Sequence, residues 1–479
     1  MIRARTRLTP AGGPATVCAM SRRLARLLPL AALALLLLTP AARAQPNVVV
    51  VMTDDQALSQ MRALPKTKAL IGGAGVTFER SYAAQPKCCP NRATFLTGQY
   101  PHNHGVRDNE PPHGGYSKLD HSETLPVWLD RAGYETAFIG KYMNGYNRVG
   151  DIPPGWDEWA ALIDFGYYNF TLNDDGESVS YGSSPADYQT DVLADRAADF
   201  IDRSAPALQP FFLWVAPQAP HVAGVRSDIG EPDNPQGAPR HQGDFKGAIA
   251  PRTPNYNERD VSDKPRYIRR QRLLSRQQKT KIDTHFRSTL ESLSAVDDMV
   301  QRLRNRLHAS GELADTLFVF TSDNGYFFGN HRSFCCKDEI YEEAARVPLL
   351  VRGPGLPGGV VRNQLVSTVD IAPTILELAG ATPGRVVDGR SLRVPARRAG
   401  AGAGRDLLIE TFNDRFFAVR SGKWKYARNQ STGEEQLFNI ATDPRELESL
   451  HADRRYRDVK LRLRQKLAQL KVCAGASCR

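Results

Sequence analysis

The sequence contains no hydrophobic run long enough to cross a membrane. The longest, residues 27–38, falls short of the roughly 20 apolar residues that a spanning helix needs, so stable membrane insertion is not expected. Three arginines precede this run, and the small-x-small sequence Ala42-Arg43-Ala44 follows it. This is the pattern of a signal peptide. Residues 1–44 are therefore predicted to be cleaved off after Ala44, and the protein to be secreted or periplasmic, with the export route left open.

The sequence also has little net charge once residues 1–44 are set aside. The formal charge of +11 comes from 63 lysines and arginines against 52 acidic residues. Seven of the arginines lie within residues 1–44, so 56 basic residues face 52 acidic ones in the remainder, a charge of +4. This excess is too small to indicate a nucleic acid partner, and none is expected. Any preference for an anionic substrate must come from local residues.

Cysteines are few, and six of the seven lie beyond residue 44. In an oxidising compartment this number allows three disulfides, with the pairing left open by the sequence. The closely spaced Cys473 and Cys478 predict a small local loop. Two adjacent doublets, Cys88-Cys89 and Cys335-Cys336, have no obvious partners.

Strand-like and helix-like segments alternate along residues 47–378. The β-branched run 47–52 is typical of a strand that is buried on both faces. The other predicted strands are residues 134–139, 211–216 and 317–320, and the predicted helices are residues 125–131, 187–201, 290–307 and 370–378. This alternation indicates an α/β fold with a mostly parallel sheet sandwiched by helices.

The remainder of the chain predicts a second, smaller unit. Residues 395–404 are rich in glycine and alanine, which is typical of a linker. Beyond them, residues 416–426 and 436–440 are predicted as antiparallel strands, and residues 458–470 as a closing helix. We therefore expect a main domain over residues 45–394 and a C-terminal α+β domain, with an antiparallel sheet, over residues 395–479.

Polar residues stand just after the predicted strands of the main domain. In an open α/β sheet, ligands bind outside the carboxyl ends of the strands, so these side chains are expected to meet at one edge. They are Asp54, Asp55, Lys141, His221, Asp323 and Asn324.

Four of these residues offer only hard oxygen ligands. Asp54, Asp55, Asp323 and Asn324 together suit Ca²⁺ or Mg²⁺ better than zinc. The alternative is that each pair caps a helix or forms a turn, since Asp and Asn favour both places. Their shared position at strand ends favours the metal site.

Cationic residues provide a second set of candidates. Arg92, Lys141, His221 and Lys337 would, if they converge on a divalent cation, bind an anionic group during sulfuryl or phosphoryl transfer. Taken singly, a lysine or arginine is usually a solvated surface group, and a histidine is usually structural. A structural role is expected for the other histidines of interest, which are His102, His104, His113 and His331.

Cys88 does not suit a hard-cation site as a thiol. A thiolate is a soft, reactive nucleophile that is prone to oxidation after export. The Cys88-Cys89 doublet is therefore either a structural disulfide partner, or one of its cysteines is converted before use.

The segment around this doublet resembles the signature of the type I sulfatase family. The matching pattern is Cys88-x-Pro90-x-Arg92-x-x-x-Leu96-Thr97-Gly98. The resemblance extends along the chain beyond residue 44, through Ser322-Asp323-Asn324-Gly325. Within the family, Gly140-Lys-Tyr-Met-Asn144 and Ile152-Pro-Pro-Gly-Trp156 are most similar to the glucosamine-6-sulfatases and the related heparan 6-O-endosulfatases.

This resemblance implies an alkaline phosphatase-like fold and a sulfuric ester hydrolase. It implies that a maturation enzyme converts Cys88 to Cα-formylglycine, whose hydrate attacks sulfur and releases the sugar alcohol. The second hydroxyl of the hydrate would then expel sulfate. One Ca²⁺ would be bound by the modified residue 88 together with Asp54, Asp55, Asp323 and Asn324.

The resemblance also gives roles to the cationic residues. Arg92 would hold the aldehyde hydrate, while Lys141 and Lys337 would bind the sulfate oxygens. His221 would protonate the leaving oxygen or help to bind sulfate.

Two features depart from the family pattern. Many relatives carry histidine where this chain has Met143, so the base that releases sulfate is unassigned, with Asn144 or His331 as weak substitutes. The doublet Cys335-Cys336, just before Lys337, matches nothing in the pattern. With Cys88 converted and Cys473 paired with Cys478, three thiols remain, and one of them must be free or paired outside the chain.

The sequence thus predicts removal of 6-O-sulfate from N-acetylglucosamine or glucosamine units of glycosaminoglycans. The alternatives are an arylsulfatase, a phosphoester hydrolase of the same superfamily, or an inactive carbohydrate-binding relative. Action at chain ends or within chains is left open. The cationic stretch 266–276 is a candidate contact for a long polyanion, or else a solvated helix face.

Overall fold

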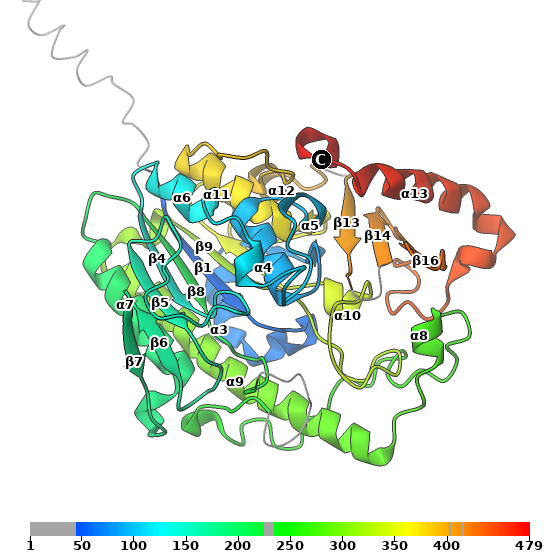
Figure 1. Cartoon of the computed structure of the whole chain (residues 1–479), viewed down its shortest axis with the longest axis horizontal. Coiled ribbons are helices and arrows are strands. Elements are labelled where there is room, and N and C mark those ends of the chain that lie inside the picture. Colours follow the sequence, from blue (N-terminus) through cyan, green and yellow to red (C-terminus); the bar gives the residue numbers. More distant parts are fainter. Residues whose placement is uncertain (1–44, 225–233, 402–403, 413–415) are drawn as a thin grey trace, which may run out of the picture. The chain divides into compact units, whose positions relative to one another are not determined.

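A ten-stranded mixed sheet forms the centre of the computed structural model, which describes residues 45–224, 234–401, 404–412 and 416–479 (Figure 1). The predicted signal peptide lies outside these residues. The strands follow one another across the sheet in the order β11 (Val360–Arg362), β2 (Val76–Phe78), β10 (Leu349–Arg352), β9 (Thr316–Ser322), β1 (Asn47–Thr53), β8 (Phe211–Ala216), β4 (Glu135–Gly140), β5 (Glu158–Leu162), β6 (Thr171–Asp174) and β7 (Glu177–Ser180).

The five neighbouring strands β9, β1, β8, β4 and β5 are parallel, as the alternation of strands and helices predicts. Antiparallel strands extend this block at both sides, so the sheet is mixed. Strand β1 is buried along its whole length, with Val49 opposite Leu213 on one side and Phe318 on the other. Each such aliphatic side chain contributes about 1.5–3 kcal/mol by its burial.

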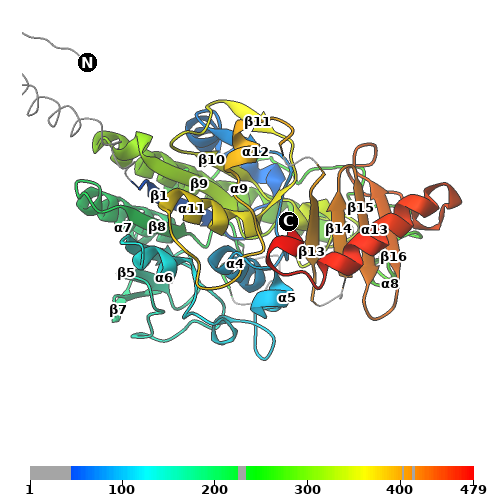
Figure 2. The same ribbon diagram turned by 90° about the horizontal axis from the view of Figure 1, so that it is seen from above.

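Helices cover both faces of the sheet. Val49 and Val51 face the helices α7 (Gln189–Ser204) and α9 (Arg276–Ala309), whereas Val48 and Val50 face α4 (Cys88–Thr97), α6 (Leu125–Asp130) and α11 (Ile371–Ala379). Figure 2 shows these two layers from above. The short connecting elements are η1 (Leu58–Ala63), α3 (Pro65–Thr67), η2 (Lys68–Gly72), α5 (Pro101–His104), η3 (Tyr116–Lys118), η4 (Pro185–Asp187), η5 (Pro239–His241), α8 (Arg266–Arg269), η6 (Glu312–Ala314), α10 (Glu342–Ala345), η7 (Thr368–Asp370) and the paired strands β3 (Ser81–Tyr82) and β12 (Val366–Ser367).

Helix α4 carries the cysteine signature. Its first residue is Cys88, preceded by Lys87 in an extended conformation, and it ends before Gly98, whose left-handed φ of 64° terminates helices at low cost. All ten residues of the helix are buried. Because residues four apart lie on the same helix face, Cys88 and Arg92 point to the same side.

The C-terminal unit is a four-stranded antiparallel sheet formed by β13 (Asp406–Glu410), β14 (Phe416–Ser421), β15 (Trp424–Asn429) and β16 (Glu435–Asn439). One face packs against α13 (Arg457–Leu470), and the other contacts Tyr82 and Tyr341 of the main unit. The closing elements are η8 (Leu450–Ala452), η9 (Arg454–Tyr456) and η10 (Gly475–Cys478).

Two details of this unit differ from the sequence prediction. Residues 416–426 are two strands rather than one, because the chain turns at Gly422, where φ is 54°. Strand β13 was not predicted. The expected division between residues 394 and 395 falls inside the short helix α12 (Arg393–Arg397), and the sheet itself begins only at Asp406.

Four of the six cysteines are paired. The predicted disulfide between Cys473 and Cys478 is present, and Cys335 is bonded to its neighbour Cys336. Cys88 and Cys89 are buried and free. Within the described residues, no helix has both the length and the apolar character of a membrane span.

Candidate active site

The predicted polar residues meet at the carboxyl edge of strands β9, β1, β8 and β4. Asp54 and Asp55 follow β1, Lys141 follows β4, and Asp323 follows β9. Potential ligand atoms of Asp54, Asp55, Cys88 and His221 all lie within 4.8 Å of one another. Residues far apart in the sequence therefore form one buried cluster.

The acidic centre of this cluster is joined by hydrogen bonds. The Asn324 side-chain amide donates to Asp55 Oδ1 at 2.7 Å, and the Asp55 backbone N–H donates to Asp323 Oδ1 at 3.1 Å. In the part of the chain that the structure describes, the buried Asn324 Oδ1 has no hydrogen-bond partner. Because an unsatisfied buried oxygen is costly, this residue, whose amide contacts Asp55, fits a site for a hard cation.

Cys88 lies at the first helical position of α4, directly against this centre. Its Sγ is 3.4 Å from Asp54 Oδ1 and 2.9 Å from Lys337 Nζ. Burial, together with the charge of Asp54, raises the pKa of the Cys88 thiol well above its ordinary value. As a thiol, Cys88 is therefore protonated and a weak nucleophile at neutral pH.

Two lysines neutralise the first two carboxylates. Lys141 contacts Asp54 Oδ2, and Lys337 contacts Asp55 Oδ1. Burial lowers the pKa of both ammonium groups, but the neighbouring carboxylates, led by Asp54 for Lys141 and by Asp55 for Lys337, reverse this effect and raise it. Both side chains are therefore cations.

Arg92 connects α4 to the acidic centre. Its Nε donates to Asp323 Oδ2 at 2.9 Å, and an Nη atom lies 3.7 Å from Asp54 Oδ2. Its other Nη donates to the Lys141 carbonyl, where the chain leaves β4. The same guanidinium thus connects α4 to the ends of strands β9, β1 and β4.

Asp54 and Asp323 differ in their pKa values. Burial raises the pKa of Asp54, but Lys141 and the other cations outweigh it and hold this pKa below its ordinary value. Burial and the charge of Asp54 raise the pKa of Asp323 to about 6. Asp54 therefore ionises at a lower pH than Asp323.

His221 lies at the open side of the cluster. Its Nδ1 is 3.0 Å from the Val222 carbonyl, which can only accept, so Nδ1 carries a proton and Nε2 faces Asp55 Oδ2 at 3.7 Å. Burial and then the charge of Lys141 lower the pKa of His221 to about 4. The ring presents Nε2 to the cluster.

The two weak substitutes for the missing base lie elsewhere. The backbone N–H of Asn144 donates to Cys89 Sγ at 3.1 Å, and its side chain also contacts this sulfur. His331 is hydrogen-bonded through Nδ1 to Glu258 at 2.6 Å, in a separate buried cluster. Neither contacts Cys88, and Met143 packs in the hydrophobic core.

The other histidines have structural contacts. His102 binds Glu410 at 2.6 Å and the Cys473 carbonyl at 2.9 Å, which ties α5 to the C-terminal unit. His104 is buried against Thr94. His113 packs on Phe412, with ring centroids 4.9 Å apart.

One residue of the site was missed by the sequence analysis. The ring of Phe165 lies 5.1 Å from Lys141 Nζ and stacks on His221 with centroids 6.3 Å apart. It stands in a loop after β5, where no periodic pattern distinguishes it. Gly140, in contrast, is visible in the sequence as a glycine at the end of a predicted strand. The structure gives the reason: its φ is 123°, and a Cβ atom at this position would lie 2.1 Å from the Ala216 carbonyl oxygen.

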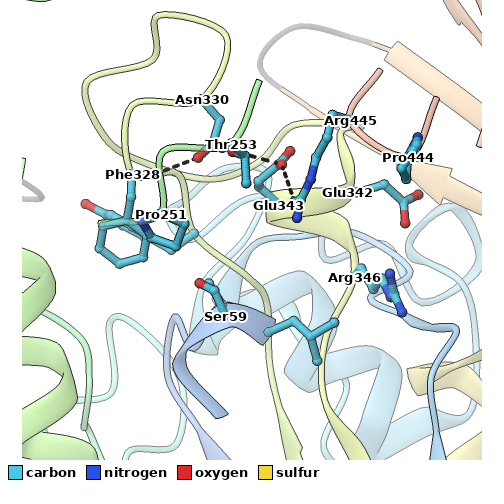
Figure 3. A pocket seen from close by; sticks show the side chains of 13 residues that line it. Ser59, Pro251, Thr253, Phe328, Asn330, Glu342, Glu343, Arg346, Pro444 and Arg445 are labelled. Carbon is cyan, nitrogen blue, oxygen red and sulfur yellow. Dashed lines mark hydrogen bonds and ion pairs between the residues drawn. The ribbon is translucent and has the colours of Figure 1, made fainter. Parts of the chain in front are cut away.

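A cavity of about 280 Å³ lies beside the cluster (Figure 3). It shares Tyr326 and Phe328 with the small space in front of His221. In Figure 3, Glu343 and Arg445 lie side by side on its lining, where they form an ion pair at 3.4 Å. Its aromatic residues Tyr326 and Phe328 follow β9, whereas Arg445 comes from the loop after β16 of the C-terminal unit.

Comparison with known proteins agrees with this geometry. Residues 46–381 match the family described as Sulfatase, and residues 329–473 match the family described as N-sulphoglucosamine sulphohydrolase, C-terminal. An N-acetylglucosamine-6-sulfatase of Homo sapiens is 33% identical over 91% of this chain and 86% of its own length. An arylsulfatase of Volvox carteri is 33% identical over 91% of this chain and 76% of its own.

A solved structure confirms the fold. This is the structure of another protein in complex with its substrate, D-glucosamine-2-N,6-O-disulfate. Its sequence is 24% identical to this chain, and the superposition has a TM-score of 0.76 and covers 89% of this chain and 97% of the other. The two share the alkaline phosphatase-like fold. The family match covers residues 46–381, and the alignment with the human relative covers 91% of this chain. This chain therefore belongs to the sulfatase family of enzymes.

Proposed function

We propose that this sulfatase hydrolyses 6-O-sulfate esters on N-acetylglucosamine or glucosamine units of glycosaminoglycans. The observation that carries this proposal is the convergence of Cys88, Lys141 and Lys337 on a buried acidic centre. The human relative named N-acetylglucosamine-6-sulfatase and the fold shared with the protein bound to a 6-O-sulfated glucosamine support the choice of sugar.

The cofactor proposed for the acidic centre is one Ca²⁺ ion. Asp54, Asp55, Asp323 and Asn324 would hold it together with residue 88, because all four side chains offer hard oxygen atoms. When bound, the cation supplies positive charge beside the developing negative charge of the sulfuryl group.

Residue 88 is proposed to act as Cα-formylglycine, made from Cys88 by a maturation enzyme. The raised pKa of the buried thiol supports a conversion, because a protonated thiol offers no strong nucleophile. When formed, the modified residue supplies an oxygen nucleophile toward sulfur in place of the thiol. Lys337 contacts the side chain of residue 88 directly, and Arg92, one turn further along α4, would hold the aldehyde hydrate.

The remaining side chains bind the ester and move the proton. Lys141 and Lys337, both cationic and buried, would hold the sulfate oxygens. His221 presents Nε2 toward the cluster without a proton, so it would have to take up a proton there before passing it to the leaving sugar oxygen, or else it would help to bind sulfate. Phe165 keeps both Lys141 and His221 in contact with one apolar surface.

We also propose that the protein is exported and acts on a sulfated carbohydrate outside the cytoplasm. The two disulfides support an oxidising compartment. Nucleic acid is not among the proposed partners, since the charge beyond residue 44 is small.

The proposal is tested by a mass measurement and a substrate comparison. Trypsin releases residues 88–92 as one peptide, and its mass reports whether position 88 is an aldehyde; two ordinary cysteines in fully active enzyme would disprove the mechanism. Sulfate release from 6-sulfated N-acetylglucosamine oligosaccharides is then compared with turnover of an aryl sulfate and an aryl phosphate. Preference for the aryl sulfate would favour the alternative that the Volvox relative suggests.

A further inference from the structure

The disulfide between the adjacent residues Cys335 and Cys336 stands directly before Lys337. Lys337 Nζ reaches both Asp55 Oδ1 and Cys88 Sγ. A covalent ring of two neighbouring residues is thus placed next to one of the two lysines of the site. Nothing in the proposed chemistry uses this ring.

The backbone on both sides of Lys337 is anchored. The Phe327 N–H donates to the Cys336 carbonyl at 3.0 Å, and the Asp338 N–H donates to the Pro86 carbonyl at 2.7 Å. The Asp338 carboxylate also forms an ion pair with Lys87 at 3.4 Å. Since residues 86 and 87 lead directly into Cys88, the loop that carries Lys337 is fixed to the start of α4.

The anchor at Cys336 depends on an unusual backbone conformation. Cys336 has a φ of 92°, a value that residues with a Cβ atom rarely adopt. Such a conformation persists where the surroundings over-determine it. The ring closed by the disulfide restricts the Cys335–Cys336 backbone, so it is the nearest covalent feature that can hold the Cys336 carbonyl toward Phe327.

We infer that the Cys335–Cys336 disulfide is a positioning element that holds Lys337 against Asp55 and residue 88. The functional consequence rests on the proposed role of Lys337 in binding the sulfate ester. In a thiol reductant, the disulfide takes up two electrons and two protons, giving two thiols while two reductant thiols become one disulfide. Position 336 then relaxes, and Lys337 leaves its place.

The first test measures the position of Lys337 without any turnover. Purified wild-type protein is treated with an amine-acetylating reagent and then digested with trypsin. Trypsin does not cleave after an acetylated lysine, so labelled protein gives one peptide of residues 333–346 in place of the two peptides 333–337 and 338–346. We expect slow labelling in the wild type, because the Lys337 side chain is only 10% exposed. In Cys335→Ser/Cys336→Ser we expect labelling about tenfold faster, with Lys141 as an internal reference that stays protected.

The unlabelled digest of the same sample checks the disulfide itself. Residues 333–337 are released as one peptide, whose mass is lower by two hydrogens when the ring is closed. A dithiol form in fully active enzyme, or unchanged labelling of Lys337 in the double variant, would overturn the inference. The matched control Cys473→Ser/Cys478→Ser removes the other disulfide and should leave Lys337 labelling unchanged.

The second test measures the effect on catalysis. The substrate is whichever sulfate ester the wild type hydrolyses. The variant Cys335→Ser/Cys336→Ser should have a KM about tenfold higher than the wild type, with a smaller change in kcat. Treatment with a dithiol should raise the KM of the wild type in the same way and should not change the KM of the double variant. In a Lys337→Met background the double substitution should change neither constant further, because it acts through the lysine. An equal effect in both backgrounds would assign the disulfide to general stability. If the wild type hydrolyses no ester, the proposed function fails, while the labelling test still decides the inference.

Discussion

Arg92 and Asp323 form a fully buried ion pair, with Nε 2.9 Å from Oδ2. The arginine lies one turn after Cys88 on α4, and the aspartate directly follows strand β9. This contact joins the helix that carries the reactive residue to the sheet edge that carries the acidic centre. The Asn91 side-chain amide makes a second link by donating to the Asp323 carbonyl, so the guanidinium fixes the relative position of the two in part.

Replacement of Arg92 by methionine is expected to destabilise the protein and abolish its activity. It leaves Asp323 buried without its cation, which costs about 3–5 kcal/mol in comparable pairs. Denaturant unfolding measures this loss, and sulfate release measures the activity. Arg131, whose pair with Glu123 is largely exposed, serves as the control, where Arg131→Met should cost about 1 kcal/mol or less.

Addition of Ca²⁺ is expected to raise the unfolding temperature, because a ligand that binds only the folded state stabilises it by mass action. A chelator should lower the unfolding temperature and the activity, and Ca²⁺ rather than Zn²⁺ should restore both. Asn324→Leu is the sharper test, since it removes the unpartnered Oδ1 without adding a charge. This variant should fold, yet gain at most half of the wild-type Ca²⁺ shift; a full shift would remove Asn324 from the proposed ligand set.

The sequence predicted the sheet edge well because its signals are local. The β-branched run of β1 and the polar residues that follow β1, β4 and β9 are enough to place Asp54, Lys141 and Asp323 together. Phe165 and the Cys335–Cys336 bond could not be predicted in this way. Their contacts depend on how irregular loops pack, and loop conformation leaves no periodic pattern in the sequence.

The C-terminal unit shows the same limit. Helix α13 was predicted almost to the residue, because its apolar positions recur with helical spacing. Strand β13 escaped prediction although it is mostly buried. It is short and directly follows the glycine-rich segment, so composition favoured a linker there.

His102 is expected to make stability depend on pH. Burial lowers its pKa, but the hydrogen bond to Glu410 reverses this and raises the pKa above the ordinary 6.5. A base with a raised folded pKa contributes stability that is complete below the unfolded pKa and is lost as pH rises through the folded value. His102→Gln should therefore lower the unfolding temperature more at about pH 5.5 than at about pH 9.

His104 provides a control of opposite sign. Burial, followed by the charge of Arg385, lowers the pKa of His104 to about 3. Below about pH 6.5, the unfolded state therefore binds a proton at this residue that the folded state does not bind. His104→Gln removes this penalty, and its effect on the unfolding temperature should become less unfavourable as pH falls. Parallel pH profiles for the two variants would contradict both assignments.

The buried pair Arg405–Asp370 is expected to hold the C-terminal sheet to the main unit. Arg405, just before β13, donates to both oxygens of Asp370, with an Nη atom 2.6 Å from Oδ1. Arg405→Leu leaves this carboxylate buried and unpaired, at an expected cost of about 3–5 kcal/mol in denaturant unfolding. The exposed pair of Arg393 and Glu377 provides a matched control, where Arg393→Leu should cost about 1 kcal/mol or less.

Removing both partners separates the pair from its surroundings. Asp370 also accepts the backbone N–H groups of Ser367 and Arg390, each at 2.9 Å. Asp370→Leu alone therefore orphans two donors as well as Arg405, and Asp370→Leu/Arg405→Leu should be less destabilising than the sum of the single changes. Strict additivity would show that the two side chains do not stabilise each other. In that case the sheet would be held mainly by its apolar face against Tyr82 and Tyr341.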